Sequence, residues 1–211
     1  SDSVEQFDKN TARMKSGETV EFDVLVLAVG VRANTELVKS VGGDVDRGII
    51  VDEKMQTSVP GIFAAGDCTQ GDDITFGSKR VLALLPNAYQ QGFCAGVNMA
   101  GGEAVFDKGV PMNSIGFFGM HVMTAGTYYD ESCGGEVYTE KDGEGIKKLF
   151  IKDGLLKGFI LIGKTERAGI YTSMIREKIP VDSVDFELMK KMPTSAAFSQ
   201  KKRGKMFGGV V

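Results

Sequence analysis

The chain has 211 residues, a formal net charge of −3 and a hydrophobic fraction of 42%, values typical of a globular protein with a substantial buried core. The slight excess of acidic residues argues against nucleic acid as a partner, because phosphate binding requires a concentrated basic surface. The only histidine is His121, which leaves few means of building a Ser-His-Asp triad or a histidine-rich metal site. We therefore expect no metal.

The apolar runs are too short for a membrane span. The longest, Val24 to Val29, falls far below the roughly 20 residues that cross a bilayer. The polar first ten residues lack the apolar segment of a secretory signal, so we expect a cytoplasmic protein that does not contact membranes. Cys68, Cys94 and Cys133 form no CxxC pair, and we expect three reduced thiols.

The first hundred residues predict alternating strands and helices. The apolar run from Val24 to Val29 ends at Gly30, which is typical of a parallel strand buried on both faces. Glycines, prolines and capping residues then delimit short elements. These are a helix at Glu36–Val41 capped by Asn34 or Thr35, strands at Ile49–Asp52 and Gly61–Ala65, a loop from Asp72 to Gly77, and a helix from about Asn87 to Ala100.

Small residues recur at every fourth position of that last helix. Ala88, Gly92, Gly96 and Ala100 form one smooth stripe, because positions four apart share a helix face. The stripe allows a close approach of another surface, and for Gly92 and Gly96 we expect tight packing on a sheet.

The sequence changes character after Gly109-Val110-Pro111, the best candidate for a domain boundary. Beyond it, strands alternate with turns before one helix, which indicates an α+β segment. The expected elements are strands at Tyr138–Glu140, Lys147–Lys152 and Leu155–Ile162, a hairpin turn at Asp153-Gly154, a helix at Arg167–Lys178 ended by Pro180, and a basic, solvated tail from Met192.

Residues Gly158 to Thr165 match the phosphate-loop pattern GxxxxGK[ST]. The four intervening residues, Phe-Ile-Leu-Ile, favour an extended buried strand whose amides are used in sheet pairing. ATP binding through Lys164 is therefore the lowest-ranked of the functions considered. No GxGxxG fingerprint of a dinucleotide-binding loop occurs anywhere in the chain.

The most informative stretch runs from Thr57 to Asp67 and ends Ala64-Ala65-Gly66-Asp67. Small residues at the end of a buried strand let a ligand approach the backbone, and a carboxylate there suits a sugar or polyol hydroxyl. It does not suit a phosphate, which its charge repels. The alternative is that Asp67 only caps a loop or a helix.

Three segments in this order resemble the pyridine nucleotide-disulphide oxidoreductase superfamily, which includes NADH oxidases, rubredoxin reductases and nitrite reductases. They are Val26 to Asn34, Gly48 to Asp52 and Thr57 to Asp67. The resemblance is strong over residues 15–105 and looser to about residue 185. It implies an α/β fold, with part of a three-layer FAD/NAD(P)-binding domain followed by a small α+β interface domain.

The resemblance also implies a cofactor, FAD, and residues that hold it. Asp67 is expected to accept a hydrogen bond from a ribityl hydroxyl, and Gly66 to let the chain pass close. Pro86, Asn87 and Ala88 match the start of a helix that points at the pyrimidine side of the flavin. Its dipole and free amides favour the negative charge that gathers there on reduction.

The chain also departs from parts of the family pattern. Glutathione-reductase-like members use a histidine followed by a glutamate near the carboxyl terminus, and His121 lacks that setting. We expect His121 to be a structural or surface residue and Cys68 to be a small buried thiol. Phe117 and Phe118 are predicted to pack in the core, with the alternative that they cover a flavin face in the same or a partner subunit.

The resemblance implies that the chain is a carboxyl-terminal fragment whose parent passes hydride from NAD(P)H to FAD and on to a small acceptor or a partner redox protein. Residues 1–109 would contain the end of the nucleotide-binding domain and the second, returning half of the FAD-binding domain. Residues 110–190 would form an interface domain that makes a homodimer, and residues 191–211 would be a flexible basic tail. Without the pyrophosphate loops and without a catalytic residue of its own, the fragment is expected to be inactive. The competing class is a non-catalytic dimerisation module.

Overall fold

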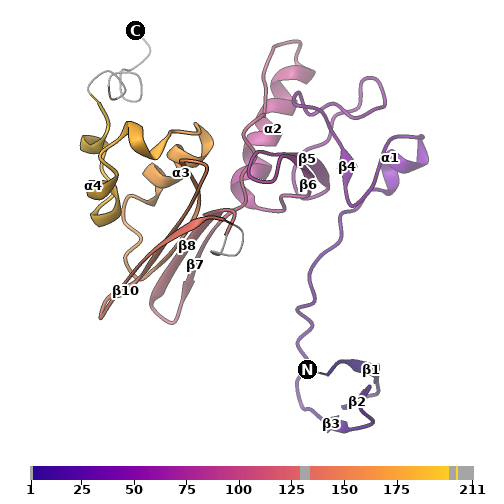
Figure 1. The fold of residues 1–211 in the computed structure, drawn as a ribbon. Coiled ribbons are helices and arrows are strands. Elements are labelled where there is room, and N and C mark those ends of the chain that lie inside the picture. The colour runs from indigo at the N-terminus through magenta and orange to yellow at the C-terminus, as the bar shows by residue number, and fades with distance from the viewer. Residues whose placement is uncertain (1, 129–133, 200–202, 204–211) are drawn as a thin grey trace. The chain divides into compact units, whose positions relative to one another are not determined.

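The computed structural model describes residues 2–128, 134–199 and 203. The chain divides into two compact units, Ser1–Val31 and Arg32–Val211. The first unit contains an antiparallel sheet in the order β1-β2-β3 (Figure 1). Its strands are β1 (Val4–Phe7), β2 (Thr11–Met14) and β3 (Thr19–Glu21).

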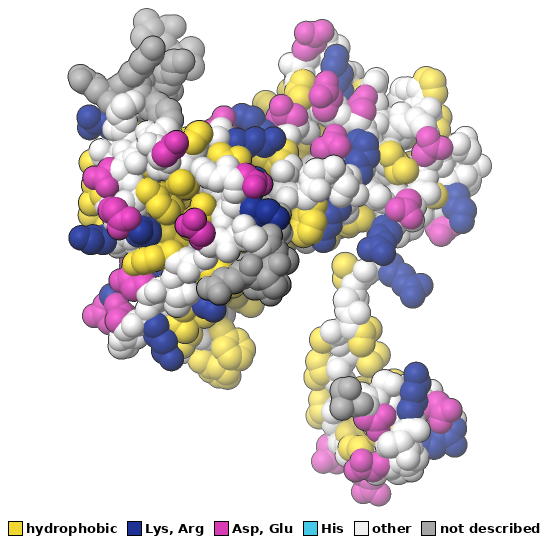
Figure 2. Space-filling model, in the orientation of Figure 1, with side chains coloured by type: hydrophobic (Ala, Val, Ile, Leu, Met, Phe, Trp, Pro, Cys, Tyr) yellow, Lys and Arg dark blue, Asp and Glu magenta, His cyan; other side chains and the backbone are white. Residues whose placement is uncertain are grey.

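The apolar run that follows β3 is not a strand. Residues 24–29 have no regular secondary structure, and their side chains are open to solvent, Val29 with 91% of its surface exposed (Figure 2). The prediction of a doubly buried strand was wrong for the described chain, because a strand forms only where neighbours pair with its amides and carbonyls. No described residue pairs with this run.

The second unit begins with a small mixed sheet in the order β4-β5-β6, in which β4 is parallel to β5 and β5 antiparallel to β6. The predicted strand at Gly61–Ala65 is only a single bridge between Phe63 and Gln56, and β5 occupies part of the predicted loop. The elements are α1 (Glu36–Ser40), β4 (Ile49–Ile50), β5 (Thr69–Asp73) and β6 (Ser78–Arg80).

Helix α2 (Leu85–Met99) confirms the predicted long helix. It ends as its two glycines require: Gly101 has a positive φ of 81°, and the amides of Gly101 and Gly102 donate to the carbonyls of Asn98 and Val97. Gly92 and Gly96 are exposed, and a Cβ added at either would meet nothing within 4 Å. The expectation that they pack on a sheet was wrong for the described residues.

The remainder of the unit is built on a five-stranded antiparallel sheet in the order β7-β8-β11-β10-β9 (Figure 1). The predicted Asp153-Gly154 turn is confirmed, with positive φ at both residues (54° and 69°), as a tight hairpin requires. The strands are β7 (Met112–Phe117), β8 (Met120–Gly126), β9 (Glu136–Asp142), β10 (Gly145–Lys152) and β11 (Leu155–Ile162).

Helix α3 (Ala168–Arg176) packs on this sheet and closes a core with it. Tyr171 of α3 is fully buried, its ring 5.6 Å from that of Phe159. Its hydroxyl donates to the carbonyl of Met189 at 2.5 Å, in helix α4 (Phe186–Lys191). The predicted helix and its end before Pro180 are therefore confirmed.

The chain stays packed beyond Met192, contrary to the expectation of a solvated tail from that residue. A short 3-10 helix, Ser195–Ala197, precedes Phe198, which is 2% exposed. Val184 and Phe198 also form a β-bridge. Burial of the Phe198 ring outweighs the polar character of its neighbours, while the lysines at 201, 202 and 205 lie outside the described residues. Within the described residues, no helix has the length and apolar character needed to cross a bilayer.

Candidate functional site

The Ala64–Thr69 loop lies against the first two turns of helix α2. Gly66 has a positive φ of 86°, and a Cβ added there would lie 3.7 Å from the Cβ of Ala88. Glycine adopts this backbone conformation without strain. The predicted residues Gly66 and Ala88 are therefore brought together, with Asp67 next in the chain.

A buried glutamine fixes the loop. The Gln91 side-chain oxygen accepts from the amide of Gly66 at 2.8 Å and from the hydroxyl of Thr69 at 3.1 Å. The amide of Thr69 donates to the carbonyl of Gly66. The Thr69 hydroxyl lies 2.8 Å from the same carbonyl oxygen and shares its one proton between that oxygen and Gln91. Because Gln91 and Thr69 are almost fully buried, these bonds are shielded from water and hold the turn in one shape.

Asp67 follows this fixed turn and is exposed. Its carboxylate forms no hydrogen bond or ion pair with any residue that the structure describes. Asp67 therefore does not serve as a cap within the described part of the chain. Both oxygens remain available as acceptors for a hydroxyl-bearing ligand.

The amino end of α2 offers free backbone donors. Its N-cap, Leu84, has no side-chain cap bond, and Pro86 occupies the first turn. The first intrahelical bond runs from Ala88 to the carbonyl of Leu84, so the amides of Leu85 and Asn87 have no helical partner. Together with the helix dipole, they favour negative charge near this end.

Asn87 is directed into the protein. Its side chain is 1% exposed and donates to the carbonyl of Val110 at 3.0 Å. Any ligand contact by Asn87 would therefore come from its backbone amide. Its side chain instead ties the first turn of α2 to the segment that precedes β7.

Three residues that define the phosphate-loop pattern, Gly158, Gly163 and Lys164, have structural roles. Gly158 lies in β11, where an added Cβ would be 2.3 Å from the carbonyl oxygen of Thr127. Gly163 has a φ of 83° and would place a Cβ 2.2 Å from the carbonyl oxygen of Glu144. Lys164 forms ion pairs with Asp142 and Glu144, which raise its pKa. The intervening amides belong to a paired strand, as the sequence predicts.

Other candidate residues lie apart from this loop. His121 is exposed on β8, as expected of a surface residue, and Cys133 lies outside the described residues. Phe117 and Phe118 are 64% and 95% exposed at the tip of the β7–β8 hairpin, so the prediction that they pack in the core was wrong. A hairpin tip projects beyond the helix that covers the sheet.

Sequence reasoning missed Gln91. A polar residue on a predicted helix is ordinarily assigned to the solvated face, and the buried face of α2 was expected to be made of small residues. The available signal was the spacing of Asn87 and Gln91, four residues apart and therefore on one face.

Comparison with known structures defines the fold. The chain superposes on a FAD-dependent pyridine nucleotide-disulphide oxidoreductase from Desulfovibrio vulgaris with a TM-score of 0.75 and 23% identity, over 96% of this chain and 54% of that one. It also superposes on a putidaredoxin reductase–putidaredoxin complex with a TM-score of 0.76 and 18% identity, over 99% and 50% of the two chains. The fold is that of FAD/NAD(P)-binding oxidoreductases.

Sequence comparison supplies the family. Residues 1–92 match the family described as pyridine nucleotide-disulphide oxidoreductase, and residues 111–179 match the rubredoxin NAD+ reductase C-terminal domain. The epsilon subunit of NADH-dependent phenylglyoxylate dehydrogenase from Aromatoleum evansii is 35% identical over 167 residues, which are 77% of this chain and 39% of that subunit. The chain belongs to the pyridine nucleotide-disulphide oxidoreductase family and spans about two fifths of the length of this relative.

Proposed function

We propose that the full-length protein is a cytoplasmic FAD-dependent oxidoreductase that passes hydride from NAD(P)H to FAD and then electrons to a small acceptor or a partner redox protein. The hydride and electron chemistry is supplied by FAD when it is bound. The residues of this chain bind and orient the cofactor. Family membership and the fold support this proposal.

The observation that carries the proposal is the unpaired carboxylate of Asp67, beside the amino end of α2. The amide of Gly66 donates to Gln91 of that helix, and a Cβ at Gly66 would lie 3.7 Å from that of Ala88, so a ligand bound by the next residue, Asp67, would also reach the helix. The donor set fits a flavin: Asp67 would accept from a ribityl hydroxyl, and the free amides near Pro86 and Asn87 would face the pyrimidine ring.

We further propose that residues 110–190 form an interface domain that makes a homodimer. The exposed aromatic side chains of Phe117 and Phe118 support this assignment, because apolar groups grouped at one tip favour burial against a partner. The same observation favours the second candidate function, a non-catalytic dimerisation module. Binding of FAD to the full-length protein separates the two.

The experiment compares FAD binding by the full-length protein and by its Asp67→Ala variant. A hydrogen bond to a charged group contributes about 1.5 to 3 kcal/mol, so we expect FAD affinity to fall about tenfold or more. Asp182→Ala is a matched control, since Asp182 is also an exposed carboxylate. Equal affinity of wild type and Asp67→Ala would remove the proposed role of Asp67.

The isolated chain of residues 1–211 provides a second measurement. We expect little FAD to remain bound and no NADH oxidation, because it has no GxGxxG loop for a pyrophosphate. A preparation that stays yellow through gel filtration would contradict this expectation.

A further inference from the structure

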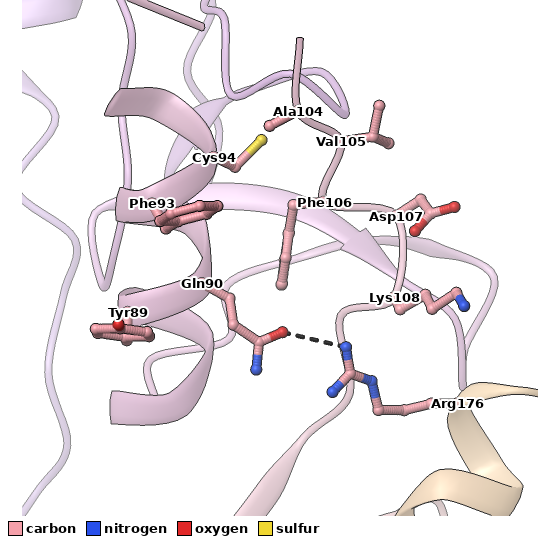
Figure 3. Close-up of a pocket in the computed structure, with 10 residues that line it drawn as sticks. All are labelled: Tyr89, Gln90, Phe93, Cys94, Ala104, Val105, Phe106, Asp107, Lys108 and Arg176. Atoms are coloured by element: carbon pink, nitrogen blue, oxygen red, sulfur yellow. Dashed lines mark hydrogen bonds between the residues drawn. The ribbon is translucent and has the colours of Figure 1, made fainter. Parts of the chain in front are cut away.

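A pocket of about 370 Å³ lies between helix α2, the segment 104–108 and the end of α3 (Figure 3). Its size falls in the range of small-molecule sites, roughly 300 to 1,000 Å³. It does not include Gly66, Asp67 or Pro86, the loop and helix start assigned to FAD above. The residues that matter for its chemistry are Gln90, Phe93, Phe106, Asp107, Lys108 and Arg176.

Arg176 has unused hydrogen-bonding capacity. Within the described residues, the only hydrogen bond of its side chain runs from Nη2 to the side-chain oxygen of Gln90, at 3.2 Å, and its buried Nε has no partner there. No carboxylate among the described residues pairs with it. A guanidinium offers five donors in a planar fork. Arg176 is half-buried, and a buried donor such as its Nε that lacks an acceptor costs free energy. Arg176 is therefore a cation with no anionic partner among the described residues.

The other charges of the pocket limit which anion fits. Lys108 is neutralised by Glu177, whose two oxygens both lie 2.8 Å from its Nζ. Asp107 is exposed and forms no hydrogen bond or ion pair with a described residue. Among the described lining residues, Arg176 is the cation without an anionic partner, and the negative charge of Asp107 repels each negative charge on a ligand. A singly charged anion is therefore opposed less than a doubly charged one.

Aromatic rings provide the remaining surface. The rings of Phe93 and Phe106 lie above the Gln90–Arg176 hydrogen bond (Figure 3). Phe106 is buried, whereas Phe93 is 65% exposed and has a face free for contact. Such walls suit a flat apolar group.

From these observations we propose that the pocket binds a small organic monoanion, a carboxylate on a planar apolar body, whose carboxylate pairs with Arg176 while its body lies along Phe93 and Phe106. The Gln90 side chain then donates to the carboxylate or keeps its bond to Arg176. This site is separate from the proposed flavin site and does not depend on it.

The test is a titration of the chain with benzoate at constant ionic strength, followed by ¹H–¹⁵N NMR. We expect saturable shifts of the Arg176 Nε–H signal, the Gln90 side-chain amide and the backbone amides of residues 104–108. Benzamide has the same shape without the charge, and we expect it to bind about tenfold more weakly or worse. Inorganic phosphate is expected to bind more weakly than benzoate.

Variants identify the residue responsible. Arg176→Gln is expected to lower benzoate affinity about tenfold or more, and Arg176→Lys by less, because lysine keeps the charge but loses the fork. Arg47→Gln removes an exposed arginine outside the pocket and should leave affinity unchanged. Asp107→Asn should tighten binding, since it removes a repulsive charge.

Equal binding of benzoate and benzamide would overturn the proposal, as would unchanged affinity in Arg176→Gln. Shifts that do not saturate, or that lie outside the pocket, would do the same. Should Arg176→Gln fail to fold, the Asp107→Asn variant decides: affinity equal to or lower than that of wild type contradicts a carboxylate site.

Discussion

The buried residues of helix α3 are all apolar or aromatic, whereas helix α2 buries two amide side chains beside Cys94 and Ala95. The buried residues of α3 include Tyr171, Met174 and Ile175, which pack on the five-stranded sheet. The inward positions of α2 include Asn87 and Gln91, and Tyr89 and Phe93 of its outer surface are 76% and 65% exposed. The two helices thus differ in that α2 leaves large aromatic side chains exposed and buries amides.

This difference indicates that the α2 region and the carboxyl-terminal region have different structural roles. The carboxyl-terminal region closes its own core and gains its stability from apolar burial. The α2 region also has an apolar core, but it uses the buried amide of Gln91 to shape the Gly66 loop and leaves apolar surface open, which is typical of a surface that meets another component. If burial rather than residue type determines how much a side chain contributes to the free energy of unfolding, matched substitutions in the two regions should differ in their effects.

The largest expected effect comes from a pair of matched truncations. Phe159→Ala removes a ring that is 1% exposed, and we expect a loss of about 3 to 5 kcal/mol in the free energy of unfolding. Phe93→Ala removes an exposed ring, and we expect a change within about 0.5 kcal/mol. Urea unfolding followed by circular dichroism measures both. A comparable loss in the two variants would refute the contrast.

The second prediction concerns the close approach of β11 to the residue after β8. Gly158→Ala would place a Cβ 2.3 Å from the Thr127 carbonyl oxygen, so the strands must separate, and we expect a loss of about 3 kcal/mol. Gly143 is exposed, and a Cβ there meets nothing within 4 Å. Gly143→Ala is therefore the control and should leave the unfolding midpoint nearly unchanged.

The third prediction concerns the buried hydroxyl of Tyr171. Tyr171→Phe leaves the Met189 carbonyl without this donor, and we expect a loss of about 1 to 2 kcal/mol near neutral pH. Urea midpoints of the two proteins at pH 7 give the value. No measurable loss would mean that the carbonyl finds another donor.

The burial of Tyr171 also predicts that the free energy of unfolding depends on pH in the alkaline range. Burial raises the pKa of its hydroxyl above the usual value, so above about pH 10 the unfolded state loses a proton that the native state keeps. Stability therefore falls with rising pH from that point, by up to about 1.4 kcal/mol per pH unit for this proton. Tyr171→Phe should show a shallower alkaline decline than wild type, measured as urea midpoints between pH 8 and 11. Equal slopes would contradict the assignment.

The smallest effect is expected for Lys164→Ala. Its ion pairs with Asp142 and Glu144 lie on the surface, where such pairs contribute little. We expect a slight loss of stability that disappears at high salt. Isothermal titration calorimetry should detect no ATP binding to the wild type or to the variant. ATP binding by the wild type that is lost in the variant would support the phosphate-loop interpretation.

Strands β9, β10 and β11 could be predicted because their signals are local, whereas β7 and β8 were not predicted. The Asp153-Gly154 turn lies between two apolar runs, and positive φ at both positions produces the hairpin wherever it occurs. Helix α3 likewise shows its apolar period and ends before Pro180. The fold class followed from the three segments that carry the family resemblance, of which Thr57–Asp67 is the most informative.

The errors fall where a structure depends on distant neighbours. The run at residues 24–29 has the composition of a buried strand, but composition does not supply a pairing partner. Gly92 and Gly96 were assigned to the packed face because small residues often mark one, and tertiary context places them in solvent. In the candidate site, Gly66 and Asp67 were visible as a motif, whereas the role of Gln91 depends on a contact across 25 residues.

The two hydrogen bonds that the Gln91 side chain accepts from Gly66 and Thr69 have a kinetic consequence. Because the buried Gln91 side chain already holds the turn, we expect the turn to keep its conformation when a ligand binds at Asp67. Binding would then require no rearrangement of the loop. Association at this turn would then follow a single second-order phase whose rate rises in proportion to ligand concentration, with no slow plateau. Replacing Gln91 with alanine would free the turn and add a slow isomerisation to the binding trace.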